Sequence, residues 1–270
     1  MTTVTKALQA PLFALLAVYL AFSSALAQAQ AMDSKHFDVD GFTRVSLKGS
    51  SHVEVIQGEN FAVSATGPTV AMPYAKAVVK GDTLELSVED NRQKWFGVVT
   101  VTWEQDQEVK FSVTMPRVEG IQVSGSGEAS AERIEGENLD LGVSGSGKVY
   151  VRKAAAETLS AFVTGSGDLI LDRALAINGE VSLTGSGDLH IGSIAGEQLS
   201  AEIKGSGDMQ INGRVADVTI RIMGSGDFVG RSLLADSAGG SVMGSGDIVL
   251  KRPRRDAFSV MGSGDVALID

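Results

Sequence analysis

Residues 139–151 read LDLGVSGSGKVYV, and this stretch returns with small changes along the second half of the chain. Its centre, Gly-Ser-Gly, occurs eight times, at steps of 20, 20, 20, 20, 19, 20 and 18 residues. A fixed period near 20 residues with strand-like flanks is typical of a solenoid, in which each repeat forms one coil stacked on the previous one. The eight copies begin at Gly125, Gly145, Gly165, Gly185, Gly205, Gly224, Gly244 and Gly262.

Apolar and polar residues alternate on both sides of each Gly-Ser-Gly. Period-two alternation predicts strands with one buried face, whereas a helix would scatter the same residues around its axis. In the quoted stretch the apolar positions are Leu139, Leu141, Val143, Val149 and Val151. A third apolar position, about ten residues after the first glycine, predicts another short inward-facing side at Ile134, Leu175, Ile194, Val215 and Leu233.

Stacking explains how such strands bury their apolar face. Copies stacked about 4.8 Å apart pair each strand with the same strand of the next coil, so that the strands are parallel and like residues form ladders. A flexible Gly/Ser linker is the alternative, but 16 of the 32 glycines lie in these motifs between aliphatic residues. The sequence therefore predicts an all-β protein, a parallel β-helix with about 20 residues per coil.

Composition narrows the class of protein. With 270 residues, of which 43% are apolar, the chain can form one domain with a continuous thin core. The absence of cysteine excludes disulfides, thiolate zinc sites and a cysteine nucleophile. A formal net charge of −10 argues against nucleic acid as a partner.

The N-terminus has the features of a secretory signal peptide. Lys6 precedes an apolar stretch, residues 11–22, that is too short to span a membrane. Overlapping small-x-small sites follow, which predict cleavage between residues 27 and 31; an uncleaved membrane anchor is the alternative. We expect a signal peptide over 1–31 and a mature chain without a transmembrane segment, exported to the periplasm or cell surface of a bacterium.

The mature chain, residues 32–270, is expected to be a single solenoid domain. Residues 121–270 hold the regular repeats. Residues 32–120 also alternate apolar and polar residues but lack the regular Gly-Ser-Gly motif. Residues 45–55, VSLKGSSHVEV, resemble a degenerate copy, so we expect irregular first coils there. Between Asp90 and Gln107, a segment with Trp95 and Trp103 is expected to leave the stack as a loop or hairpin, whose role the sequence does not indicate.

Two segments resemble a known family. Residues 41–58, which begin Gly41-Phe42 and end VEVIQG, and residues 113–127, VTMPRVEGIQVSGSG, are similar to the bacterial head GIN domain family of auto-transporter adhesins. The resemblance covers essentially the whole mature chain. It implies an exported right-handed β-helix of the pectate-lyase-like kind, named for supposed adhesion, and supplies no catalytic residues.

An acidic residue follows most of the motifs, and stacking would align these carboxylates along one edge. A row of calcium sites is the functional interpretation, since carboxylate oxygens are the ligands that calcium prefers. The alternative, which we favour, is that each carboxylate accepts backbone amide hydrogens at the corner, so that no metal is bound. The six candidates are Asp168, Asp188, Asp208, Asp227, Asp247 and Asp265.

The sequence favours a non-enzymatic role. It contains no Ser/His/Asp signature, metal-ligand spacing or nucleotide-binding loop, so we assign no catalytic residue and no cofactor. The leading hypothesis is an exported adhesin or envelope binding module whose partner is a surface glycan or an envelope protein. The alternative is a carbohydrate-active enzyme, a polysaccharide lyase or hydrolase, on the same scaffold.

Two further features indicate contact surfaces. The position before the motif is polar in early copies but is Met223, Met243 and Met261 in the last three. If the alternation continues to the corner, these methionines form an exposed apolar stripe and a possible homo-oligomer interface through the C-terminal coils; otherwise they are core. The one basic cluster, residues 251–255, is either a solvated loop or a docking patch for an acidic glycan.

Overall fold

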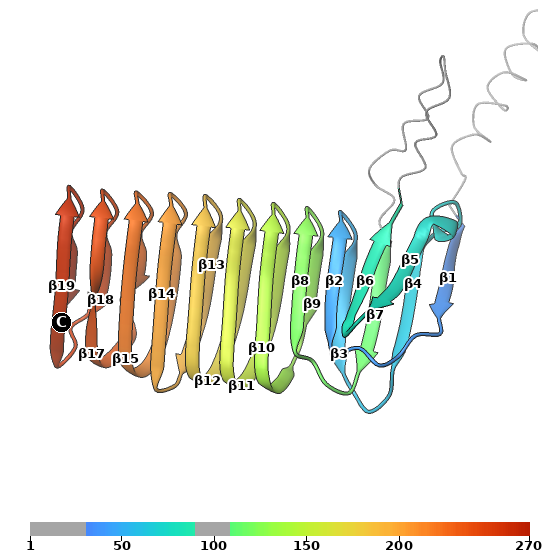
Figure 1. Cartoon of the computed structure of the whole chain (residues 1–270), viewed down its shortest axis with the longest axis horizontal. Helices are drawn as coiled ribbons and strands as arrows, with labels where there is room; N and C mark the ends of the chain where they lie inside the picture. Colours follow the sequence, from blue (N-terminus) through green and yellow to red (C-terminus); the bar gives the residue numbers. More distant parts are fainter. Residues whose placement is uncertain (1–30, 90–108) are drawn as a thin grey trace, which may run out of the picture. The chain divides into compact units, whose positions relative to one another are not determined.

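The computed structural model describes residues 31–89 and 109–270, and within them the fold is a parallel β-solenoid of about eight turns with about 20 residues per turn (Figure 1). The predicted fold class is confirmed. No α-helix occurs in the described residues, which contain one short 3-10 turn, Met72–Tyr74. Residues 1–30, which hold nearly all of the expected signal peptide, and the segment with Trp95 and Trp103 lie outside the described ranges.

Each coil consists of two strands that face each other across the core, joined by a Gly-Ser-Gly corner at one end and a bend at the other. The strands that build the stack are β2 (Arg44–Gly49), β3 (His52–Gln57), β8 (Gly120–Gly125), β9 (Glu128–Ala131), β10 (Ile134–Gly145), β11 (Lys148–Gly165), β12 (Asp168–Gly185), β13 (Asp188–Ala195), β14 (Gln198–Gly205), β15 (Met209–Gly224), β16 (Phe228–Gly230), β17 (Leu233–Gly244), β18 (Ile248–Lys251), β19 (Arg255–Gly262) and β20 (Val266–Ile269). Strands β11, β12 and β15 run through the bend without interruption, so in their coils the expected third side is part of a continuous strand.

Each strand residue pairs with the residue one repeat later in the chain, which is 20 residues on in most coils. Leu141 pairs with Ala161, which pairs with Val181, and corner glycines pair with corner glycines. The alternating apolar residues point inward as predicted: Leu139, Leu141, Val143, Val149 and Val151 are at most 1% exposed. Each ladder therefore continues one narrow core along the stack.

One predicted core residue is wrong. Leu175 is 59% exposed, and Ala174 fills the inward position instead. The inward ladder at the bend runs through Ile134, Ala154, Ala174 and Ile194, each nine residues after its corner glycine. Counting about ten residues selected the outward neighbour in this coil, because a one-residue shift moves a strand residue to the opposite face.

The Gly-Ser-Gly corners are held by a ladder of backbone hydrogen bonds. In all eight copies the serine N–H donates to the carbonyl oxygen of the first glycine, or its counterpart Gly49, in the preceding coil, at 2.8–2.9 Å. The first glycine of every copy has a φ between +117° and +139°. A Cβ on Gly185 would lie 2.1 Å from the Gly165 oxygen, the same atom that accepts the hydrogen bond.

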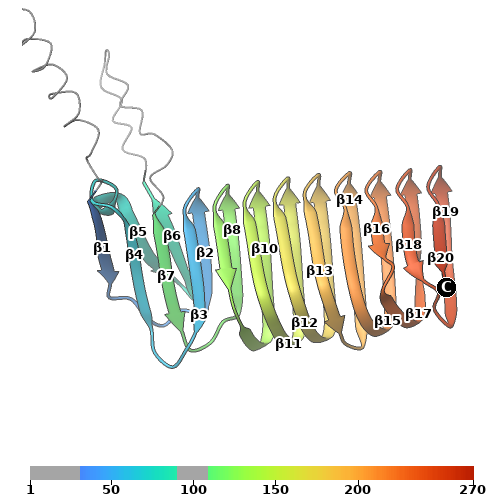
Figure 2. The ribbon, with the colours of Figure 1, turned by 180° about the vertical axis from the view of Figure 1, so that it is seen from behind.

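The N-terminal end of the stack is closed by antiparallel strands (Figure 2). Strands β6 and β7 continue the parallel pairing of β2 and β3, and antiparallel β5 and β4 then cover them. This cap consists of β1 (Met32–Phe37), β4 (Ala62–Pro68), β5 (Ala75–Lys80), β6 (Thr83–Val88) and β7 (Lys110–Met115). Because its direction reverses, it cannot template another parallel coil.

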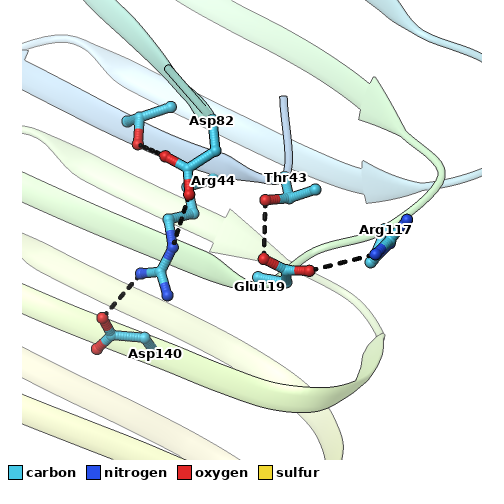
Figure 3. Close-up of polar contacts among 7 residues, drawn as sticks. Thr43, Arg44, Asp82, Arg117, Glu119 and Asp140 are labelled. Carbon is cyan, nitrogen blue, oxygen red and sulfur yellow. Dashed lines mark hydrogen bonds and ion pairs between the residues drawn. The ribbon is translucent and has the colours of Figure 1, made fainter. Parts of the chain in front are cut away.

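A polar network ties the cap to the first coils (Figure 3). Arg44 contacts Asp82 of the cap through Nε at 3.7 Å and Asp140 of β10 through Nη1 at 3.0 Å. The arginine reaches Asp140 across Gly120, which is its partner in the register; a Cβ there would lie 3.0 Å from Nη1. Beside it, Thr43 Oγ1 donates to Glu119 at 2.9 Å. The Arg44 side chain of β2 thus connects the cap, through Asp82, with β10, through Asp140.

A second group of ion pairs connects the cap with β2. The Glu85 carboxylate lies 2.8 Å from the ammonium groups of both Lys48 in β2 and Lys80 in β5. Hydrogen bonds to Lys48 and then Lys80 hold the pKa of Glu85 below its ordinary value, because both favour the charged form.

We predict that Gly185→Ala destabilises the solenoid by about 3 kcal/mol or more, since the added Cβ combines an unfavourable φ with backbone overlap. Gly81→Ala is the matched control, because Gly81 also has a positive φ, +64°, but no atom within 4 Å of the added Cβ. It should cost only about 1–2 kcal/mol of conformational strain. Urea denaturation followed by circular dichroism measures both; equal losses would show that the close approach between corners is unimportant.

Candidate binding site on the outer face

The aspartates after the motifs form a column along the corners, and their carboxylates hydrogen-bond to the next coil. Asp208 accepts the backbone N–H of Asp227 at 3.0 Å, Asp227 accepts that of Asp247 at 2.8 Å, and Asp247 accepts that of Asp265 at 2.7 Å. The carboxylates therefore act as corner acceptors in the late coils. The acceptor is on the neighbouring coil, whereas a local turn was expected.

The early copies use a different acceptor. The backbone N–H groups of Lys148, Asp168 and Asp188 donate to the carbonyl oxygen of the second motif glycine in the preceding coil, at 2.9–3.2 Å. In this part of the column Lys148 pairs with Asp168 and Glu128, so opposite charges alternate. No group of three or more His, Cys, Asp or Glu side chains in residues 31–89 and 109–270 is arranged to hold a metal ion.

We predict that Asp227→Ala lowers stability by about 1 kcal/mol, because it removes a charge-assisted hydrogen bond between coils. Asp188→Ala is the control: Asp188 lies in the same column, but its carboxylate has no such bond, so its loss should change stability by less than about 0.5 kcal/mol. Thermal melting of both variants checks this, and equal melting temperatures would contradict it.

The calcium interpretation makes a different prediction for the same column. Calcium would then raise the melting temperature well beyond sodium chloride of equal ionic strength, and Asp188→Asn with Asp208→Asn would abolish the effect. We expect only the general salt effect of screening between like charges.

The methionine positions lie on the outer surface. Met223, Met243 and Met261 pair in register; the first is half-buried, and the others are 45% and 74% exposed. The alternation therefore continues up to the corner, as the stripe hypothesis requires. Whether the stripe binds a partner stays a prediction.

Two of the four cations in the basic cluster, Arg252 and Arg254, contact carboxylates of the chain. Arg252 Nε lies 2.9 Å from Asp270, and its Nη2 donates to the Leu268 carbonyl oxygen at 2.9 Å. Arg254 lies 3.6 Å from Asp236. Arg252 and Arg254 are thus paired within the chain, and docking of an acidic glycan at this cluster stays a prediction.

A different basic site lies at the bend opposite the Gly-Ser-Gly corners. Lys153 of β11, Arg173 of β12 and Ser193 of β13 are partners in the register and point outward beside a depression of about 370 Å³. The two cations precede the buried Ala154 and Ala174, and Arg173 is exposed while Lys153 is half-buried. The structure thus aligns cationic side chains from consecutive coils.

Apolar residues continue this surface away from the charges. Leu175 and Ile177 of β12 are 59% and 47% exposed. Alanines Ala155 and Ala195 are the partners of Leu175 on the two neighbouring coils, so one large side chain stands between two small ones. A second depression of about 250 Å³ lies here. We call the surface formed by Lys153, Arg173, Ala155, Leu175, Ile177 and Ala195 the bend strip.

The bend strip carries available positive charge. Arg133 on its edge is paired with Glu135, but neither Lys153 nor Arg173 has an ion-pair partner among the described residues. The adjacent Asp172 carboxylate accepts a hydrogen bond from Tyr150 Oη at 2.7 Å, and this bond, with desolvation, raises the pKa of Tyr150. Lys153 and Arg173 are therefore able to bind an anion next to an apolar surface.

Sequence reasoning missed this site, although one signal for it was present. Arg133, Lys153 and Arg173 each follow a corner glycine by eight residues, in three consecutive repeats. Comparing columns across repeats, in addition to searching for motifs along the chain, would have revealed it.

The comparisons with known proteins place the chain in a family. The model of the family described as "Putative auto-transporter adhesin, head GIN domain" matches residues 41–175 and 172–269, so the chain belongs to that family. The resemblance recognised in the sequence is confirmed. No curated protein matches the chain.

Solved structures share the fold. A "putative adhesin" from Parabacteroides distasonis has a TM-score of 0.78 at 18% identity, with 89% of this chain and 98% of that chain covered. A second "putative adhesin", from Parabacteroides merdae, has a TM-score of 0.76 at 18% identity, covering 90% and 98%. A "Putative lipid binding protein" from Parabacteroides distasonis has a TM-score of 0.66 at 16% identity, also covering 90% and 98%. At these identities the likeness establishes the fold alone.

In the described part of the chain no helix has the length and apolar character needed to cross a membrane.

Proposed function

We propose that this protein is an exported, non-enzymatic binding module of the bacterial envelope that holds an acidic surface glycan along the bend strip. The observation that carries the proposal is the pair of unpartnered cations, Lys153 and Arg173, stacked beside the exposed Leu175 and Ile177. Membership of an adhesin family supports a binding role.

The ladder geometry suits a chain-like ligand. Neighbouring coils repeat about every 4.8 Å, so a polymer lying along the stack can contact Lys153 and Arg173 in two successive coils. Two neighbouring cations favour a polymer that carries an acidic group on successive units. The aliphatic surface beside them can contact the apolar faces of its sugar rings. Because the net charge of −10 disfavours anion binding on the rest of the surface, an anionic ligand would bind at a local basic site such as this one.

A binding role fits the arrangement of the acids better than catalysis does. A glycosidase needs two carboxylates set apart from their surroundings by different environments. The corner aspartates instead occupy equivalent positions, and three of them accept backbone N–H groups. Those three carboxylates, of Asp208, Asp227 and Asp247, are occupied in bonds between coils.

Export is the first testable part. We predict that the protein recovered from the periplasm or cell surface begins at residue 28, 30 or 32, because small-x-small sites end at 27, 29 and 31. Intact-mass measurement with N-terminal sequencing checks this; an exported protein that retains Met1 would contradict it.

Glycan binding is the second part. Titration calorimetry with an acidic polysaccharide and a neutral one should show binding of the acidic polymer only, weakened by salt. Lys153→Glu with Arg173→Glu should lower the affinity at least about tenfold, since each reversed charge replaces attraction by repulsion. Product analysis of the same mixtures tests the enzyme alternative, which shortened chains would support.

Arg221→Glu with Arg231→Glu is the matched control, because it changes the net charge equally at two exposed arginines outside the bend strip. Its affinity should stay within about twofold of the unmodified protein. Equal losses in both double variants would mean that binding follows net charge, and no binding by the unmodified protein would refute the glycan as ligand.

A further inference from the structure

The two ends of the solenoid differ. At the N-terminal end, the cap strands cover β2 and β3. At the C-terminal end, β19 pairs with β17 and β20 pairs with β18, and no described strand lies beyond them. Both last strands therefore present one unpaired backbone edge, over eight residues in β19 and four in β20.

The core is also open at this end. Val242, Ile248 and Leu250 are fully buried, yet their partners one coil later are not. Val260, the partner of Val242, is 45% exposed, and Val266 and Leu268 are only partly buried. The side chains still point inward, and no described strand covers them on the side away from β17 and β18.

We propose that a second copy of this chain covers the open end, pairing β19 and β20 antiparallel with the same strands across a two-fold axis. A copy adding its N-terminal end is the less favoured partner, because β4 and β5 run antiparallel there and do not repeat the pattern of the C-terminal coil. Two open ends, by contrast, present the same edges and the same unfinished core to each other.

A single two-fold axis can give both the β19–β19 pair and the β20–β20 pair an alignment in which inward residues face each other. Inward residues must face inward residues across an antiparallel pair. An axis through Ser259 sets Phe258 opposite Val260 of the second copy. An axis through Ala267 sets Val266 opposite Leu268 of the second copy. Ser259 lies three residues before Gly262, and Ala267 lies three residues after Gly264, so both positions are at the same height below the corner. A single two-fold axis can pass through both.

The other side chains in this register are complementary. Asp256 occupies an inward position, as the partner of the buried Ala238, and would be unfavourable opposite an apolar residue. Here it faces Gly262 of the second copy, which has no side chain. On the outer face, Ala257 lies opposite the large, 74% exposed Met261. Size and polarity therefore match along the whole of β19.

Charge favours the same arrangement. Antiparallel pairing brings Arg255, the first residue of β19, next to the corner after β19 in the second copy. That corner contains Asp265, at the end of the aspartate column. A parallel continuation would instead place like charges side by side. The end of the solenoid is thus self-complementary in the antiparallel direction.

Sedimentation analysis of the processed protein should give the mass of a dimer. Val260→Glu should raise the dimer dissociation constant at least about 100-fold, because the carboxylate is tolerated at an exposed end but not in a closed core. Met243→Glu is the matched control: Met243 is also 45% exposed, one coil earlier, but points outward. It should leave the dimer intact, and circular dichroism should show both variants folded.

Cysteine cross-linking tests the axis directly, since the chain has no cysteine of its own. Ser259→Cys should form a disulfide-linked dimer, because residues opposite each other in an antiparallel pair come within disulfide range. Ser241→Cys, its partner one coil earlier, should not. A monomeric unmodified protein, equal cross-linking of the two variants, or dissociation by Met243→Glu would overturn the proposal; the last result would assign the contact to the methionine stripe.

Discussion

The corner hydrogen bond from serine N–H to glycine oxygen is the interaction on which the rest of this structure depends. It sets the distance between coils at the point where the chain reverses, and it leaves no space for a Cβ on either motif glycine: at Gly185 and Gly187 that atom would lie 2.1 Å from a carbonyl oxygen of the preceding coil. With the corners fixed, strand register follows, and with register every outward residue falls into a column. The aspartate column, the methionine stripe and the bend strip are all consequences of that alignment.

Because every corner can pair with another, the coils at the two ends of the stack each have a side that other structure must cover. Stability in such proteins is approximately a sum of repeat and neighbour terms, and an uncovered terminal repeat lacks one neighbour. The N-terminal end is closed by reversed strands and tied down by Arg44, which reaches from Asp82 to Asp140. The C-terminal end has no comparable structure among the described residues. Its Arg252 satisfies the Leu268 carbonyl oxygen, but the inward Val260 stays exposed.

The fold could be predicted from sequence because every repeat carries the same information. Glycine spacing and two-residue alternation define the coil, and eight copies average out local exceptions. The exceptions themselves could not be predicted in this way: Leu175 differs from its neighbours by one position, which is enough to change faces. The antiparallel cap has the same alternating texture as the parallel coils, and strand direction depends on pairing partners that a single strand does not encode. Likewise, Arg44 and Asp140 are 96 residues apart, and only the stacked register brings them together.

The candidate site was harder to predict than the fold, because its residues come from equivalent positions in consecutive coils and do not form a motif along the sequence. Lys153 and Arg173 are unremarkable along the chain, and they become a site only when consecutive coils place them side by side. Binding surfaces of solenoids arise in this manner, from residues that the repeat leaves free to vary on its outer face. The motif glycines, by contrast, are the same in all eight copies, because the contact between coils leaves no space for a side chain.

Amide hydrogen exchange at the corner serines tests the central claim most directly. If the corner bonds hold the coils together, the N–H groups of Ser186, Ser206 and Ser225 should exchange as slowly as that of the core residue Val181, in spite of their position at the surface of the protein. Exchange of these serines at the rate of open loops, while Val181 stays protected, would show that the strands stack without the corners and would contradict this account.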